Sequence, residues 1–241
     1  MRSFFSSVSI GRARTTLGDT GVLPPRGDDG DDHSDSGWSN FEMRLRRARL
    51  GLLVGLIGIL MVFASLTSAY IVRQGLPTFD PRTNTMVHDW LPVRLPGILL
   101  VNTCVLLISS VTMELARRGA LAEVSSIPGV SLGGEVRVFW LSVTFLLGLS
   151  FLTGQWVAWR QLTAGGFDVA ATPSSSFVYL LTGMHGVHLL GGIVALLIAG
   201  VTAVLRRRTE SRAVVLDVTG WYWHSMALLW VYILCLLKFV R

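Results

Sequence analysis

FVYLLTGMHGVHLLGGIVAL, residues 177–196, contains no Asp, Glu, Lys or Arg, yet it holds two histidines, His185 and His188. A helix needs about 20 mainly apolar residues to cross the roughly 30 Å hydrocarbon core of a bilayer, and this stretch has that length. Polar side chains are costly inside hydrocarbon and normally face protein or water. The stretch therefore predicts a membrane-spanning helix whose two imidazoles need a defined environment.

The composition of the whole chain also indicates a membrane protein. Of the 241 residues, 51% are hydrophobic and only 15% are charged, whereas soluble domains carry about 25% charged residues. The net charge of +6 comes from short arginine clusters between apolar runs, a pattern that sets membrane topology and argues against nucleic-acid binding. Cys104 and Cys235 each lie inside an apolar run, which argues against a disulfide or zinc framework.

Five apolar runs follow an N-terminal tail, residues 1–43, that is rich in Ser, Gly, Asp and Arg. We expect this tail to be disordered and cytoplasmic, because it has no apolar segment that could act as a signal peptide. In lipid, only helices and closed barrels satisfy their own backbone hydrogen bonds, so these runs predict helices. Residues 44–241 are therefore predicted to form an all-α, polytopic membrane bundle. The five predicted helices cover about residues 50–72, 95–115, 138–159, 177–205 and 222–240.

The basic residues predict the orientation of the bundle. With the N-terminus inside, 15 of the 21 Lys and Arg residues lie on the inner side and 6 on the outer side. Because cytoplasmic loops are enriched in these residues, we expect a cytoplasmic N-terminus and a periplasmic C-terminus. The loops are too short for a further folded domain, so any activity resides in or against the helices.

Small residues share one face of the first predicted helix, which would let another helix approach closely, although glycine is also common in membrane helices. These helix-packing candidates are Gly51, Gly55, Gly58, Ser65 and Ala69.

Few polar side chains fall inside the predicted helices. Asn102 and Gln155 lie within spans, whereas Glu114 lies at a helix end, three and four residues before Arg117 and Arg118. That spacing predicts ion pairs on one helix face.

The histidines leave several interpretations open. His185 and His188 share a helix face, and neutral imidazole is a good ligand for copper, iron or zinc. A metal site needs further ligands, however, and His224 is the one other histidine in a predicted span. Packing, hydrogen bonding to another helix or subunit, and proton or lipid contacts are the alternatives to metal or haem ligation.

Aromatic and basic side chains mark the predicted helix ends. Indoles near helix ends anchor to the membrane interface, and we expect this of Trp159 and Trp223, with Trp156 and Trp230 more buried. The cluster of Arg206, Arg207 and Arg208 is a candidate contact for anionic lipid head groups or a plain topology signal.

Several segments together resemble one family. The stretch 177–196 is similar to the fourth helix of the five-helix form of subunit III of the haem-copper terminal oxidases, which include cytochrome c oxidase. FLTGQWVAWRQL, with Gln155 and Trp159, and WYWHSMALLWVYI, with Tyr222, Trp223, His224 and Trp230, resemble its third and last helices. MVFASLTSAYIVRQG and RLPGILLVNTCVLLISSVTMELARR resemble the first two, so the likeness runs from about residue 50 to the C-terminus.

This resemblance implies a non-catalytic subunit of an aerobic respiratory oxidase, fed by cytochrome c or quinol, in the inner membrane of a bacterium. It implies that haem and copper reside in partner subunits and that this chain carries no cofactor and no metal, only structural phospholipids. It further implies direct contact with subunit I, association with subunit II and small subunits, and support of proton uptake.

The sequence departs from the family where acidic residues are often found. Those positions are Ile59, Ala158 and Ala227 here, so we expect any role of these acids to be lost or moved to a partner. In the seven-helix form the first two helices supply a wall that faces the other five, and in this shorter form we expect subunit I to supply it.

Two other interpretations remain. One is an accessory, subunit III-like protein of nitric-oxide reductase, which has a similar five-helix pattern. The other is a stand-alone membrane cytochrome that uses His185, His188 and His224.

Overall fold

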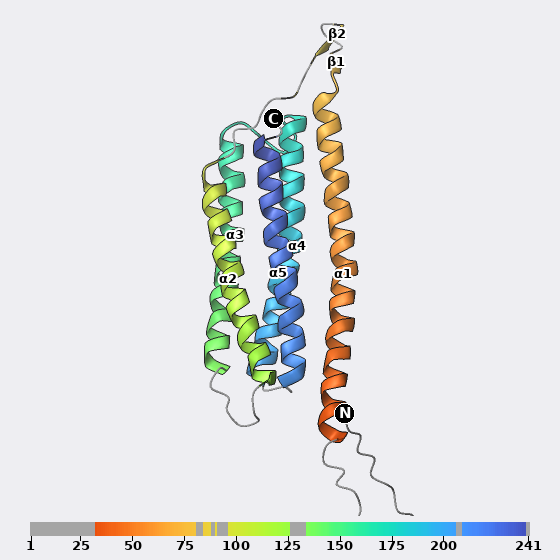
Figure 1. The fold of residues 1–241 in the computed structure, drawn as a ribbon. Helices are drawn as coiled ribbons and strands as arrows, with labels where there is room; N and C mark the ends of the chain where they lie inside the picture. Colours follow the sequence, from red (N-terminus) through yellow and green to blue (C-terminus); the bar gives the residue numbers. More distant parts are fainter. Residues whose placement is uncertain are drawn as a thin grey trace, which may run out of the picture. The chain divides into compact units, whose positions relative to one another are not determined.

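The computed structural model describes residues 32–80, 84–87, 90, 96–125, 134–205 and 209–239. Figure 1 shows long helices and, between the first and second helices along the chain, two short antiparallel strands. The elements are α1 (Asp32–Gly75), β1 (Thr78–Asp80), β2 (Thr85–Val87), α2 (Ile98–Ser125), α3 (Gly134–Ala164), α4 (Pro173–Val204) and α5 (Thr209–Phe239). Five helices are long and apolar enough to cross a membrane, which confirms the predicted all-α membrane fold.

The helices extend beyond the predicted apolar runs, because a helix continues through polar turns outside the hydrocarbon. The largest difference is in α5, which begins at Thr209 rather than near residue 222. At the other end of the chain, α1 begins at Asp32, inside the predicted tail, while residues 1–31 of that tail lie outside the described residues. The chain divides into two units, Met1–Ser39 and Asn40–Arg241, and the second holds the bundle.

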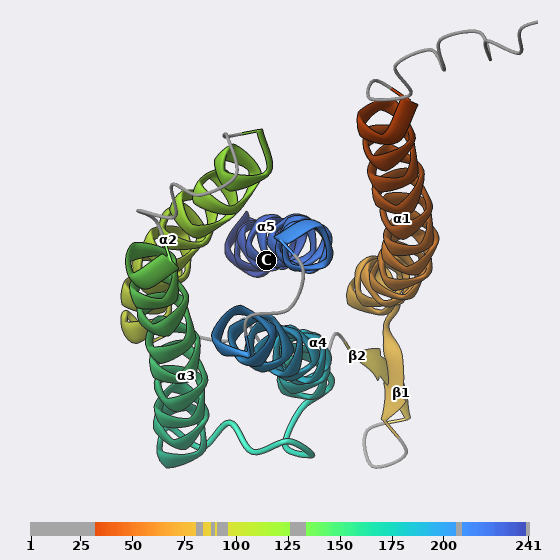
Figure 2. The ribbon, with the colours of Figure 1, turned by 90° about the horizontal axis from the view of Figure 1, so that it is seen from below.

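Helices α2 to α5 form a closed ring of contacts, seen end-on in Figure 2. α2 packs against α3 and α5, and α4 packs against α3 and α5. The interior is filled by large side chains, among which Phe151, Trp223 and Trp230 are almost fully buried. Glycine allows the closest approach: a Cβ on Gly154 would stand 2.0 Å from Asn102 Oδ1.

Long aromatic side chains connect α1 to this ring. Phe63 and Tyr70 are buried, and the Phe63 ring lies 5.7 Å from the imidazole of His188. Tyr70 packs edge-on against Trp90 and Phe177, at centroid distances of 5.0 and 5.8 Å. Aromatic pairs in this arrangement contribute about 0.5–1.5 kcal/mol beyond the area that they bury.

The predicted small-residue face of α1 points away from these contacts. Its members, Gly51, Gly55, Gly58, Ser65 and Ala69, are all exposed, and no described atom lies within 4 Å of a Cβ built on the three glycines. At about 100° per residue, the small residues and the buried aromatic residues occupy different sides of the helix. Close packing of a helix against this face therefore stays a prediction, and that helix would belong to another polypeptide.

Candidate functional site: a charge cluster and a polar layer

A buried carboxylate lies at the end of the bundle where α1 begins. Asp217 of α5 is fully buried and accepts hydrogen bonds from Arg49 Nε and an Arg49 terminal nitrogen, at 2.7 and 3.0 Å. It also accepts one from Arg117 of α2 at 2.8 Å. Because a buried carboxylate is stable only when it is paired and hydrogen-bonded, Asp217 joins α1, α2 and α5 at this level.

Glu114 extends the same group of charges along α2. It accepts hydrogen bonds from Arg117 at 2.8 and 3.0 Å and from Arg118 at 2.7 Å, which confirms the predicted ion pairs. His224 of α5 lies 3.2 Å from Glu114 through Nε2, and its Nδ1 is hydrogen-bonded to Ser110. We call Arg49, Ser110, Glu114, Arg117, Arg118, Asp217 and His224 the charge cluster.

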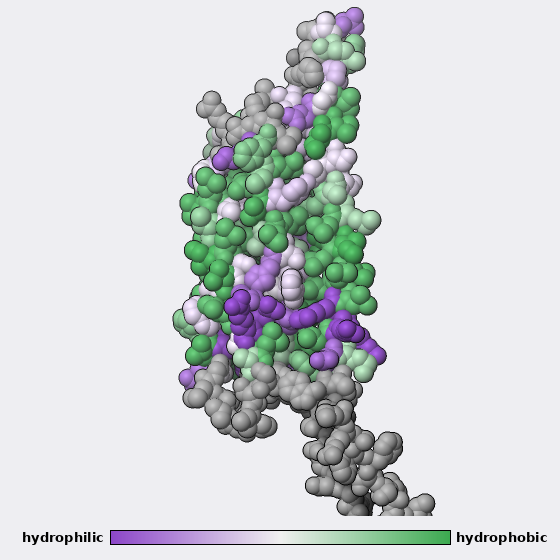
Figure 3. Space-filling view, in the orientation of Figure 1, coloured by the Kyte–Doolittle hydropathy of each residue, from purple (hydrophilic) through white to green (hydrophobic). Residues whose placement is uncertain are grey.

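Figure 3 shows hydrophilic side chains gathered below a hydrophobic belt on one face of the molecule, and the charge cluster contains exposed side chains such as that of Arg118. Its exposure is graded, from 0% for the Asp217 side chain through 22% for Glu114 to 76% for Arg118. Three arginines against two carboxylates leave a net charge of one positive unit when His224 is neutral. The cluster thus couples a buried ion pair to a basic surface.

Sequence reasoning missed Asp217, because the apolar run that predicted the last helix began at residue 222. The signal was nonetheless present in AVVLDVTGWYW, residues 213–223, where apolar residues continue at helical spacing on both sides of the aspartate. Arg49 and Arg117 lie 168 and 100 residues before Asp217 in the sequence, so no local spacing could pair them with it.

A second polar group occupies the core of the ring, further from the start of α1. We call Asn102, Thr103, Gln155, Thr182, His185 and Trp230 the polar layer. The Asn102 amide lies 3.5 Å from the Phe151 carbonyl. The indole of Trp230 donates to Thr103 at 3.0 Å, and that of Trp159 donates to Thr182 at 3.1 Å. These bonds cross between helices and hold their register.

The three membrane histidines do not converge. His185 is fully buried against the rings of Phe151 and Trp230, with centroid distances of 5.9 and 5.1 Å, and these two rings also contact each other. His188 reaches the carbonyl of Met184 on its own helix at 2.7 Å, and His224 belongs to the charge cluster. Within the described ranges, no group of three or more His, Cys, Asp or Glu side chains is placed to hold a metal ion. The geometry gives no support to a cytochrome built on these histidines.

Two tryptophans differ from expectation. Trp223 was predicted at a membrane interface but is completely buried and donates to Ser109 at 3.1 Å, because α5 starts well before it. Trp156 was predicted to be buried but is 60% exposed, since it faces outward from α3. Trp230 is 1% exposed, as predicted.

The remaining predicted residues are placed as follows. The hydroxyl of Tyr222 donates to the His188 carbonyl at 2.8 Å and so links α5 to α4. Ala158 and Ala227, where the family often has acids, are buried in the core, and Ile59 packs against it. A carboxylate at either alanine position would therefore need a buried partner. Arg206, Arg207 and Arg208 lie outside the described residues.

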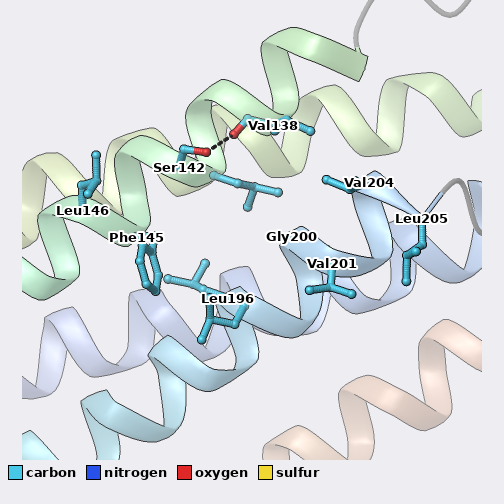
Figure 4. Close-up of a pocket in the computed structure, with 11 residues that line it drawn as sticks. Val138, Ser142, Phe145, Leu146, Leu196, Gly200, Val201, Val204 and Leu205 are labelled. Carbon is cyan, nitrogen blue, oxygen red and sulfur yellow. Dashed lines mark hydrogen bonds between the residues drawn. The ribbon is translucent and has the colours of Figure 1, made fainter.

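An apolar groove runs between α3 and α4 (Figure 4) and has a volume of about 540 Å³. Its walls include Phe145 and Leu146 of α3 and Leu196, Gly200 and Val204 of α4. Among the described residues that line it, only Ser142 has a polar side chain, and this hydroxyl donates to the Val138 carbonyl at 2.9 Å. The described side chains of the groove therefore offer a ligand an apolar surface, and their one hydroxyl is already hydrogen-bonded.

A second hollow, of about 620 Å³, lies where α3 ends and α4 begins. Trp156, Trp159 and Tyr179 line it together with Arg160. Aromatic rings beside a basic side chain are typical of the membrane interface, where one part of a side chain is in lipid and another in water.

Comparison with known proteins gives a consistent result over most of the chain. A family model described as "Cytochrome c oxidase subunit III" matches residues 37–240. "Probable cytochrome c oxidase subunit 3" of Mycobacterium tuberculosis is 29% identical over 195 residues, which is 80% of this chain and 87% of that protein. "Cytochrome c oxidase subunit 3" of Corynebacterium diphtheriae is 26% identical over 192 residues, with the same shares. "Cytochrome bo(3) ubiquinol oxidase subunit 3" of Pseudomonas aeruginosa is 30% identical over 133 residues, 55% of this chain and 59% of that protein.

Proposed function

The chain belongs to the cytochrome c oxidase subunit III family, and we propose that it is the non-catalytic third subunit that stabilises subunit I of a haem-copper oxidase. The observation that carries this proposal is the family match from residue 37 to residue 240, which includes all five candidate membrane spans. The relatives named above are subunits of cytochrome c or ubiquinol oxidases, and this favours an oxidase over a nitric-oxide reductase complex.

The small-residue face of α1 supports contact with subunit I. Association of helices in lipid depends on close packing, because lipid chains are as apolar as the side chains of the helices. The face formed by Gly51, Gly55 and Gly58 is exposed in this chain and has no side chains that would keep a partner helix away. We assign it to subunit I, with subunit II and any small subunits joining the same assembly.

Phospholipid binding is the second part of the proposal. The groove between α3 and α4 is apolar along its length, which suits an acyl chain. Its lining ends with Val204 and Leu205, and Arg206, Arg207 and Arg208 follow directly in the sequence. Basic residues next to an apolar span attract anionic head groups, so one phospholipid can use both features.

Support of proton uptake is the third part, and it rests on the charge cluster. The positive-inside rule assigns the end of the bundle that holds Arg49, Glu114 and Asp217 to the cytoplasmic side of a bacterial plasma membrane. Arginine stays protonated in proteins, so we assign this role to the contact between Glu114 and His224 and place it beside a partner's proton entry site. No electron-transfer step is assigned to this chain.

The experiment is affinity purification of the tagged chain from its native membrane in mild detergent, with an optical spectrum and subunit identification on one sample. We expect haem and copper with a many-helix catalytic subunit, and no haem spectrum once the chain is separated from it. A matched sample tests the interface: Gly55→Leu on the small face should lose subunit I, whereas Gly186→Leu, on α4, should retain it. A stoichiometric haem on the isolated chain that is lost in His185→Phe would overturn the proposal.

Phospholipid counts on the same complex test the groove. Gly200→Leu fills part of it and should reduce the retained phospholipid by about one molecule per chain relative to Gly186→Leu. Equal counts in both variants would remove the groove from the proposal.

A further inference from the structure

Three polar atoms in the core of the bundle have no hydrogen-bond partner among the described residues: Gln155 Oε1 and both ring nitrogens of His185. The two residues are 4% and 0% exposed, so neither bulk water nor another subunit reaches them. His188, one turn further along α4, differs because its Nδ1 is bonded to the Met184 carbonyl. A neutral imidazole has one N–H donor and one acceptor nitrogen, and His185 uses neither within the described chain.

Gln155 and His185 lie at the same height in the bundle. Two contacts fix how the antiparallel helices α3 and α4 run past each other: Trp159 bonds to Thr182, and Gly148 meets Ile193. One step forward along α3 is matched by one step back along α4, so residue 155 lies opposite residue 186, the neighbour of His185. At a rise of 1.5 Å per residue, the backbone positions of Gln155 and His185 differ in height by about 1.5 Å.

Most other polar groups of this layer are already engaged, and the amide nitrogen of Asn102 lies 3.5 Å from the Phe151 carbonyl. Trp230 packs against His185, but its indole N–H points to Thr103. The Thr182 hydroxyl donates to the Val178 carbonyl and accepts from Trp159. The remaining neighbour of known geometry, Phe151, presents only its ring. A partner for the imidazole must therefore be small, internal and able both to donate and to accept.

We propose that the polar layer contains a water-binding site, in which one or two water molecules bridge Gln155 Oε1 and the imidazole of His185. Buried water typically makes about three hydrogen bonds to groups that would otherwise be unsatisfied, whereas purely apolar cavities stay dry. One water molecule donates to the glutamine oxygen and accepts from the imidazole N–H. A second water molecule donates to the other, unprotonated ring nitrogen of His185. A metal ion does not fit, since the layer supplies one imidazole and no Cys, Asp or Glu ligand among the described residues.

This site goes beyond the proposed function and does not depend on it. The bridge joins α3 to α4 in a core layer where the described side chains do not satisfy each other. It also gives a reason for a fully buried histidine in a membrane helix.

A high-resolution cryo-EM map of the wild-type chain, with the subunits that copurify, tests the proposal directly. We expect a density peak about 2.6–3.2 Å from Gln155 Oε1 and from a ring nitrogen of His185. The peak should be absent in Gln155→Leu and present in His188→Phe, which removes an imidazole that is already bonded to its own helix. The wild-type map decides alone if Gln155→Leu does not assemble. A glutamine amide bonded directly to the imidazole, or a layer without density between the two side chains, overturns the proposal, as does a peak that persists in Gln155→Leu.

Discussion

Replacing Asp217 by asparagine should destabilise the protein more than any exposed charge substitution of the same kind. Asparagine keeps the size of the side chain and some of its hydrogen-bonding capacity, but it removes the buried negative charge that faces Arg49 and Arg117. Hydrogen bonds to charged groups contribute about 1.5–3 kcal/mol, against about 1 kcal/mol for neutral ones. The Arg117 side chain is only 17% exposed, so most of the loss arises at this contact.

The share of Arg49 is smaller, because its side chain is 47% exposed and water screens the pair. Arg117 also keeps its bonds to Glu114 in the variant. We therefore expect Asp217→Asn to lower the free energy of unfolding by about 2 kcal/mol, below the roughly 3–5 kcal/mol for breaking a fully buried ion pair. For a chain of this length, that corresponds to a decrease in Tm of about 4–8 °C.

The assay is thermal unfolding of the purified complex in detergent, followed by tryptophan fluorescence. The matched control is Asp168→Asn, which makes the same chemical change at an exposed position beyond α3 and should leave Tm within about 1 °C of the wild type. Arg49→Gln should fall between the two. The reasoning is refuted if Asp217→Asn melts together with Asp168→Asn, or if Arg49→Gln is the more damaging change.

Two further predictions use the packing of the core. Gly154→Ala places a Cβ 2.0 Å from the side-chain oxygen of Asn102, so overpacking should cost about 1–3 kcal/mol and lower Tm. The control is Gly186→Ala, whose Cβ would have no described neighbour within 4 Å beyond its own helical turn and which should leave Tm unchanged. Equal melting of the two glycine variants would show that the helices separate freely at this level. Trp223→Phe should lower Tm because it removes a buried indole and its hydrogen bond. Trp221→Phe, at a side chain that is 49% exposed, should have little effect in the same thermal assay. A larger decrease in Tm for Trp221→Phe than for Trp223→Phe would contradict the assigned burial.

Local features of the site were predictable, and distant ones were not. The pairing of Glu114 with Arg117 and Arg118 could be predicted because residues three and four apart are neighbours on a helix. The place of His224 beside Glu114 could not, since 110 residues separate them and only the packing of α2 against α5 brings them together. The start of α5 at Thr209 decided two more outcomes, because it moved Asp217 into the helix and Trp223 into the core.

The sequence by itself determined the five-helix membrane fold and the family, because both depend on the length and order of apolar runs and on motifs that can be read along the chain. Tertiary structure alone decided which polar residues have partners: it paired Asp217 with two distant arginines and buried His185 against two aromatic rings. The physical reason is that helix formation in lipid depends on each segment's own backbone and hydropathy, whereas the partner of a buried polar group depends on which helices meet and in which register.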